Sequence, residues 1–338
     1  MDSNYVTRVR ELGFQWETNN PFLFCVHHLD HYPRGNGEMG PAASLAGRNL
    51  GQDFTLRDGW RMYHGMKIPG FPVHPHRGFE TVTVVLNGFV DHADSMGAAG
   101  RYGNGDVQWM TAGAGMQHAE MFPLINTDAD NPLELFQIWL NLPARNKFVE
   151  PYYSMLWNED IPRLNLKDGS GKTTEVTVIA GSVDGAKAPP PNPDSWAAPE
   201  ESQVAIWLIK MDAGAEWEIP AASEEATRSI YYYQGEQIRV DGQEIDSYKS
   251  AGLHPAQKIL IENGSGESRI LLLQGRPIEE PVIQYGPFVM NTEAEIRQAF
   301  MDYRETEFGG WPWSRPDQVH ERGRGRFARY PDGAEETR

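Results

Sequence analysis

Cysteine is almost absent from this chain, since Cys25 is the only one in 338 residues. A disulfide within the chain is therefore excluded, and the chain tolerates a reducing compartment. Long apolar runs are absent too, because no stretch approaches the ~18 apolar residues that a membrane-spanning helix needs. Residues 1–17 mix charged with apolar side chains and lack the continuous apolar core of a signal peptide. We therefore expect a soluble, cytoplasmic protein.

Positive charge is also scarce, with 30 Lys and Arg against 47 Asp and Glu and a net charge of -17. Such a surface repels phosphate backbones, so we expect no direct nucleic-acid partner. The tail after Trp313 differs, because Arg322, Arg324, Arg326 and Arg329 stand there among glycines and aromatic residues. An RNA-contacting tail is the alternative, but a disordered or surface-laid extension is favoured.

Apolar residues are plentiful enough for packed cores, at 40% hydrophobic and 11% aromatic. The length is about twice the usual domain size of roughly 150 residues, which predicts two domains. The chain also carries 34 Gly and 24 Pro, so turns should be frequent. Frequent turns favour many short strands, and we expect an all-β protein with one helix.

Strand signals are dense in the first half. Residues 81–86, TVTVVL, end at Asn87-Gly88, which predicts a β-hairpin with a return strand over residues 89–93. Four glycines follow between residues 97 and 105, but no helix start comes after Gly105. Because a phosphate loop needs a helix N-terminus, we interpret these glycines as turns. Further strands are predicted over residues 107–111 and 133–142.

The second half is also rich in strand signals. Strands are predicted there over residues 175–179, 204–210, 229–234, 237–240, 258–262 and 269–273. Residues 186–201 are too rich in proline for a helix or a central strand, so they form a linker or a loop over the second domain. Thr292 and Glu295 form a capping box, which predicts a helix near residues 292–308.

Two pairs of potential metal ligands share one spacing. His74 and His76 stand two residues apart, and so do His118 and Glu120. On an extended segment, residues two apart point to the same face. Pro75, between the first pair, is expected at a strand edge or a bulge. Two such pairs on facing strands would surround one ion, whereas the ordinary alternative is four polar residues in turns.

The donor set indicates the class of metal. Three imidazole nitrogens and one carboxylate suit a divalent transition metal better than Mg or Ca, which prefer oxygen ligands. We predict Fe(II) first, with Mn, Ni, Co, Cu or Zn as alternatives. Four protein ligands on an octahedral ion would leave two positions open. The second half has only His254 before the tail, so it offers no comparable site.

Three strings carry a family resemblance: HPHRGFETVT at residues 74–83, GDVQWMTAG at residues 105–113 and HAEM at residues 118–121. They resemble the signatures of the pirin family, within the cupin superfamily, and YGPFVMN at residues 285–291 is similar to its C-terminal segment. The resemblance implies a bicupin, with two antiparallel β-barrel (jelly-roll) domains and a C-terminal helix. It implies a metal-binding domain over residues 1–165, a domain without ligands over residues 166–308, and an extension over residues 309–338.

Carried onto this sequence, the family's metal ligands fall on His74, His76, His118 and Glu120. The general cupin pattern would instead offer Glu80, four residues after His76, as a ligand or a supporting residue. His92 could also support the ligands, but a place on the strand surface is favoured. His64 is a candidate for the mouth of the site.

The resemblance also implies a function. Pirin-like proteins are similar to quercetin 2,3-dioxygenases, so we expect a dioxygenase that attacks a metal-bound quercetin, or a related flavonol or polyphenol, with O₂. Glu120 would be the catalytic base that takes the hydroxyl proton. The alternative is a metal-dependent regulatory protein that binds transcription factors or metabolic enzymes without turnover. A metal-assisted isomerase is a third class that a cupin scaffold allows.

Overall fold

The computed structural model describes residues 5–338, and most of its regular structure is β-strand. The chain divides into two compact units. The 26–158 unit contains Val26–Asn158 and Glu280–Arg338, and the 159–279 unit contains Glu159–Glu279 and the stretch that ends at Cys25. Each unit therefore joins segments distant in sequence, whereas the predicted domain ranges are contiguous. The helix and the C-terminal extension group with the 26–158 unit.

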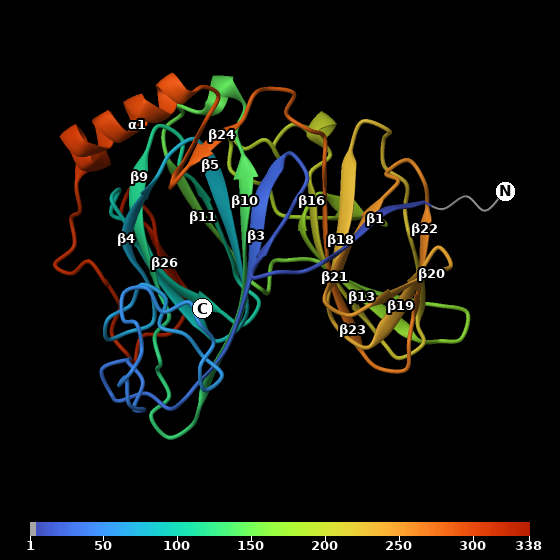
Figure 1. Ribbon diagram of the computed structural model, residues 1–338, viewed down its shortest axis with the longest axis horizontal. Helices are drawn as coiled ribbons and strands as arrows, with labels where there is room; N and C mark the ends of the chain where they lie inside the picture. The colour runs from blue at the N-terminus through green and yellow to red at the C-terminus, as the bar shows by residue number, and fades with distance from the viewer. Residues whose placement is uncertain (1–4) are drawn as a thin grey trace. The chain divides into compact units, whose positions relative to one another are not determined.

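The 26–158 unit contains two large antiparallel sheets (Figure 1). The β9 sheet has the order β27-β26-β7-β6-β9-β4, with β4 Gly70–His76, β6 Phe89–Asp94, β7 Ala99–Gly103, β9 Met116–Met121, β26 Phe327–Arg329 and β27 Glu335–Thr337. The β5 sheet has the order β11-β8-β5-β10-β3, with β3 Phe22–Tyr32, β5 Phe79–Asn87, β8 Val107–Thr111, β10 Asn131–Asn141 and β11 Tyr152–Leu156. A short hairpin joins β24 Ile283–Tyr285 to β25 Phe288–Met290.

The turn at Asn87-Gly88 does not close a hairpin, so that prediction is wrong. Gly88 has a φ of 79°, and a Cβ there would lie 2.6 Å from the carbonyl oxygen of Pro132, so the turn is as tight as predicted. However, β5 pairs with β8 and β10, whereas β6 pairs with β7 and β9. The turn therefore sends the chain from one sheet to the other, as corners of β-sandwiches do.

The other strand predictions near this turn are confirmed. No helix follows Gly105, as predicted, and Gly97 and Gly105 lie in turns. Gly100 and Gly103 lie instead in strand β7, so their interpretation as turns is wrong. Strand β10 begins two residues before the predicted 133–142 segment and ends one residue before the end of that segment. Strand β5 lies between β8 and β10, and its side chains are buried from Phe79 to Val85.

The 159–279 unit is built the same way, from a seven-stranded and a four-stranded antiparallel sheet. The larger has the order β1-β21-β18-β23-β16-β13-β12, with β1 Val6–Glu11, β12 Arg163–Lys167, β13 Thr173–Ala180, β16 Ala205–Met211, β18 Thr227–Gln234, β21 Lys249–Leu253 and β23 Ser268–Gly275. The smaller has the order β17-β22-β19-β20, with β17 Glu216–Ile219, β19 Gln237–Val240, β20 Gln243–Asp246 and β22 Ile259–Asn263. Shorter elements of the chain are β2 Gln15–Trp16, β14 Ser182–Val183, β15 Ala186–Lys187 and the 3-10 turns η1 Ala144–Asn146, η2 Glu200–Ser202 and η3 Glu307–Gly309.

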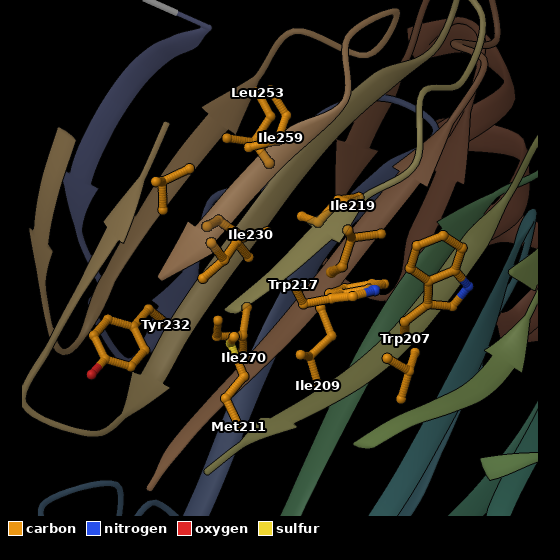
Figure 2. Close-up of a cluster of buried hydrophobic side chains, with 14 of the residues drawn as sticks. Trp207, Ile209, Met211, Trp217, Ile219, Ile230, Tyr232, Leu253, Ile259 and Ile270 are labelled. Carbon is orange, nitrogen blue, oxygen red and sulfur yellow. The ribbon is translucent and has the colours of Figure 1, made fainter. Parts of the chain in front are cut away.

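The six strands predicted for this half all form. The proline-rich segment, residues 186–201, lies within the 159–279 unit, so it is a loop of that unit and not an interdomain linker. Large apolar side chains fill the interior of the unit, among them Trp207, Trp217 and Ile270 (Figure 2). None of these three is more than 8% exposed.

The predicted helix is α1, Glu293–Thr306, and it is the only α-helix in the described residues. Thr292 accepts a hydrogen bond from the Glu295 backbone, and the Glu295 side chain accepts one from Thr292, which confirms the capping box. Ile296 and Ala299 are buried against Phe288. Within residues 5–338, no helix combines the length and the apolar character needed to cross a membrane.

The C-terminal tail is not a disordered extension. Strand β26 pairs with both β7 and β27, so the tail adds two strands to the edge of the β9 sheet. Its arginines are also engaged, because Arg324 lies 2.5 Å from a Glu335 carboxylate oxygen and Arg326 lies 2.7 Å from Asp106. Arg329 lies 3.7 Å from Glu335. These three arginines are paired with carboxylates of the protein, which favours a structural role for the tail over the alternative of RNA contact.

The core of the 159–279 unit gives a matched test on one strand. Ile261 of β22 is fully buried, whereas its neighbour Leu260 is 37% exposed. Ile261→Ala should lower the free energy of unfolding by about 2–5 kcal/mol, because it leaves a cavity. Leu260→Ala should change it by about 0.5 kcal/mol or less. Urea unfolding followed by tryptophan fluorescence measures the free energy of unfolding of both variants. Equal losses of stability would contradict the different burial of Ile261 and Leu260.

Candidate metal centre

Two neighbouring strands bring the predicted histidines together. Strands β4 and β9 pair antiparallel, and His74 stands directly opposite His118 in their register. The two pairs therefore lie on adjacent strands of one sheet, where the prediction placed them on facing strands. Opposite residues on adjacent strands have side chains about 5 Å apart, which suits ligands of one ion. Strand β4 is the edge of its sheet, and its register shifts between Phe71 and His74, as expected beside Pro75.

The three imidazoles converge. One ring nitrogen of each of His74, His76 and His118 lies within 4.8 Å of the other two, and no other group of metal-binding side chains this compact occurs in residues 5–338. The ring centroids are 4.4 Å apart for His74 and His118, and 4.9 Å apart for His76 and His118. His76 and His118 are buried, and His74 is partly exposed.

Two of the rings are oriented by backbone carbonyls. His74 Nδ1 lies 2.8 Å from the oxygen of Pro72, and His76 Nδ1 lies 3.4 Å from the oxygen of Pro287. A carbonyl can only accept, so Nδ1 carries the proton in both rings. The Nε2 lone pair is then available for a metal, which is the usual arrangement of ligating histidines.

The electrostatics favour neutral rings. Burial lowers the pKa of His74 to about 4 and the pKa values of His76 and His118 well below their ordinary value. The neighbouring histidines lower the pKa of His118 further, because they would repel a second positive charge. All three imidazoles are therefore neutral near pH 7, as metal ligands must be.

His118 supplies the test of whether an ion fits. Both of its ring nitrogens are buried, and neither has a hydrogen-bond partner. A buried polar atom without a partner carries a free-energy penalty of about 1–3 kcal/mol. A metal ion bound by the three histidines would remove that penalty at one nitrogen. The residues present therefore fit a transition-metal ion.

Glu120 stands beside this cluster but is anchored elsewhere. Its Oε2 lies 3.7 Å from His118 Nε2 and accepts a hydrogen bond of 2.6 Å from Gln137. Its Oε1 accepts one of 3.2 Å from Thr83. These donors belong to β10 and β5, so the Glu120 side chain points from the β9 sheet toward the β5 sheet. Burial raises the pKa of Glu120, and its role as fourth ligand stays a prediction.

Glu80 is held within its own sheet. Its Oε1 accepts hydrogen bonds from Trp109 Nε1 at 3.1 Å and from Thr111 Oγ1 at 2.7 Å, both on the neighbouring strand β8. The compact histidine group does not include Glu80. The hydrogen bonds to β8 favour a supporting role for this carboxylate, although its part in the site also stays a prediction.

His92 is buried, so the predicted place on the strand surface is wrong. Its ring centroid lies 5.6 Å from that of His118, and its Nε2 lies 3.2 Å from an Asp94 oxygen. Gln108 Nε2 donates to His92 Nδ1 at 3.0 Å. In the sequence, His92 and Asp94 show the same two-residue spacing as the ligand pairs. That spacing could have indicated that the His92 and Asp94 side chains point to the same buried face of the strand.

The remaining histidines lie outside the cluster. His64 is exposed, and its Nδ1 lies 2.6 Å from the carbonyl oxygen of Gly51. Its ring lies 5.6 Å from that of Phe71, which in turn lies 6.3 Å from the ring of His74. Phe71 thus lies between His64 and His74, and the place of His64 at the mouth of the site stays a prediction.

Metal content tests the histidine cluster. Wild-type protein should carry close to one transition-metal ion per chain, and His118→Ala should lose most of it, because an incomplete set of ligands binds weakly. His64→Ala is the matched control and should keep its metal, since His64 lies outside the cluster. Metal analysis of the purified proteins measures both, and full occupancy in His118→Ala would exclude His118 as a ligand.

Comparisons with known proteins agree with the fold and the motifs. The family model for Pirin matches residues 38–140, and the model for the Pirin C-terminal cupin domain matches residues 206–309. Pirin of Homo sapiens is 38% identical over 252 residues, which cover 73% of this chain and 80% of that protein. The Pirin-like protein of Solanum lycopersicum is 38% identical over 70% of this chain and 75% of its own length.

Among solved structures, the crystal structure of quercetin 2,3-dioxygenase from Acinetobacter baumannii superimposes with a TM-score of 0.70 at 27% identity. The superposition covers 90% of this chain and 98% of that one. Both cupin units and the sequence around the histidines thus have counterparts in one family. The chain belongs to the pirin family, with an N-terminal and a C-terminal cupin domain.

Proposed function

We propose that this pirin-family protein is a metal-dependent dioxygenase that acts on quercetin or a related flavonol or polyphenol. The observation that carries the proposal is the group of three neutral imidazoles, His74, His76 and His118, beside the buried carboxylate of Glu120. The substrate class is supported by the similarity to the quercetin 2,3-dioxygenase of Acinetobacter baumannii.

His74, His76 and His118 would hold the metal together with Glu120, and Fe(II) is the ion we propose first. Nitrogen-rich donor sets with one carboxylate suit such ions. When bound, the ion supplies Lewis acidity, which lowers the pKa of a flavonol hydroxyl group. The protein's own part is to hold the imidazoles neutral and oriented, which burial and the carbonyls of Pro72 and Pro287 accomplish.

Glu120 would accept the hydroxyl proton. Burial raises the pKa of its carboxyl, and a base whose pKa lies closer to the working pH takes a proton more effectively. Thr83 and Gln137 each donate to one carboxylate oxygen, which fixes the orientation of the group. Glu120 is thus directed at the same space as His118.

Aromatic side chains line the inner side of the cluster. The His76 ring lies 5.0 Å from Phe79 and 5.2 Å from Trp139, and those two stack at 3.9 Å. Both aromatic residues are buried. Such a wall excludes water from one side of the histidines, which strengthens electrostatic interactions within the site.

Replacing Glu120 with glutamine tests the base role. The variant keeps the shape of the side chain but loses the proton acceptor, so activity per bound metal should fall by about 10²–10⁴-fold. Oxygen consumption with quercetin, divided by metal content, is the measurement. Glu80→Gln is the matched control and should retain most of its activity per metal.

Two results would contradict the proposal. Unchanged activity per metal in Glu120→Gln would exclude the proton transfer. A fully metal-loaded wild-type protein that consumes no O₂ with any member of a flavonoid and catechol panel would exclude the dioxygenase. That second result would favour the alternative function, a metal-dependent regulatory protein that binds other proteins without turnover.

A further inference from the structure

Each histidine of the cluster has a chain neighbour that bonds to one C-terminal segment, residues 302–316, which we call the brace. Next to His74, the Val73 backbone N–H donates to the carbonyl oxygen of Pro316 at 2.8 Å. Next to His76, Arg77 lies 2.6 Å from an Asp302 carboxylate oxygen. The brace thus touches the ligand strands at residues adjacent to the ligands themselves.

The third neighbour, Gln117, precedes His118 and makes two bonds to the brace. Its Nε2 donates to the carbonyl oxygen of Glu307 at 2.7 Å, and its Oε1 accepts from the Tyr303 hydroxyl at 3.0 Å. Gln117 is only 4% exposed, so water does not compete strongly for these bonds. Its backbone N–H donates to Ser95 Oγ at 3.0 Å.

The brace lies on the opposite face of the strand from the site. Successive side chains of a strand point to opposite faces, so Gln117 leaves β9 on the side away from His118. The approach is close, because Gly115 has a φ of +129° and a Cβ there would lie 2.8 Å from the ring of Phe308. The guanidinium of Arg77 also lies 4.5 Å from that ring.

His118 depends on this contact more than the other two histidines do. Carbonyl oxygens orient the rings of His74 and His76, whereas neither ring nitrogen of His118 has a hydrogen-bond partner. The direction of the His118 ring is therefore set by ring packing and by the position of the β9 backbone. Gln117 fixes that backbone to the brace at the adjacent residue.

We propose that Gln117 is a positioning residue for His118, and that the brace sets the metal affinity of the cluster through it. The inference rests on the proposed metal site but not on the proposed reaction. It assigns a function to the end of α1 and the segment after it, whose bonds are made to the chain neighbours of the ligands.

The test is a double-mutant cycle on the full chain, with Co(II) as the probe. Gln117→Ala should weaken Co(II) binding about tenfold, at the lower end of what outer partners of metal ligands contribute. Tyr303→Phe removes only the hydroxyl that donates to Gln117, so it should weaken Co(II) binding less than Gln117→Ala does. Because Tyr303 acts through Gln117, its effect should vanish in the Gln117→Ala background.

The visible absorption spectrum of bound Co(II) is the second measurement, since a displaced His118 changes its intensity and position. Arg297→Ala is the matched control, because Arg297 lies on the same helix and pairs with exposed Glu293. It should leave both affinity and spectrum unchanged. Thermal unfolding of the metal-free variants shows what fraction is folded at the titration temperature.

Three outcomes would overturn the inference: wild-type affinity and spectrum in Gln117→Ala, additive effects of the two substitutions, or a loss of binding equal to the loss of folded protein. Failure of the metal site itself is distinguishable, because then the wild-type protein would not bind Co(II) either. Co(II) binding by the wild type without any O₂ consumption would leave this inference standing and remove only the proposed reaction.

Discussion

The site depends on one pairing, the antiparallel register of β4 and β9 that sets His74 opposite His118. A slip of one residue would turn every side chain of one strand to the other face, and the imidazoles would separate. The bonds that surround this pairing hold the register: Pro316 caps the edge of β4 at Val73, and Gln117 ties β9 to the helix end. The convergence of the three imidazoles is thus a consequence of this strand pairing.

Burial has opposite effects on the two kinds of side chain in this site. It lowers the pKa of the histidines, which frees their lone pairs, and raises the pKa of Glu120, which makes it a better proton acceptor. The same desolvation leaves His118 without a hydrogen-bond partner. A fold that buries such a group gains stability when an ion arrives, since the penalty of about 1–3 kcal/mol is then removed. Binding of an ion at the histidine group would therefore be coupled to the folding of this unit.

Local signals in the sequence predicted the histidine group, the turn at Gly105 and the capping box of α1, because each depends on residues a few positions apart. The sequence did not reveal that the turn at Asn87-Gly88 changes sheets, since that depends on which distant strands pair with β5 and β6. It also misplaced His92, whose burial results from packing against Tyr153 and Gln108. The two strands of the tail were not predicted for the same reason, because β26 forms by pairing with the edge of the distant strand β7.

The two cupin units share an architecture of two antiparallel sheets but differ in the side chains of their interiors. In the 26–158 unit, three histidines of β4 and β9 converge, and Glu120 accepts hydrogen bonds from Thr83 and Gln137 of the β5 sheet. In the 159–279 unit, Trp207, Trp217 and isoleucines occupy the interior, as Figure 2 shows. Indole and branched aliphatic side chains pack closely and offer no ligand atoms of the kind that metal ions prefer. Since chemistry resides in sites and not in the fold, two units of like architecture can differ in what they bind, and the compact histidine group lies in the 26–158 unit.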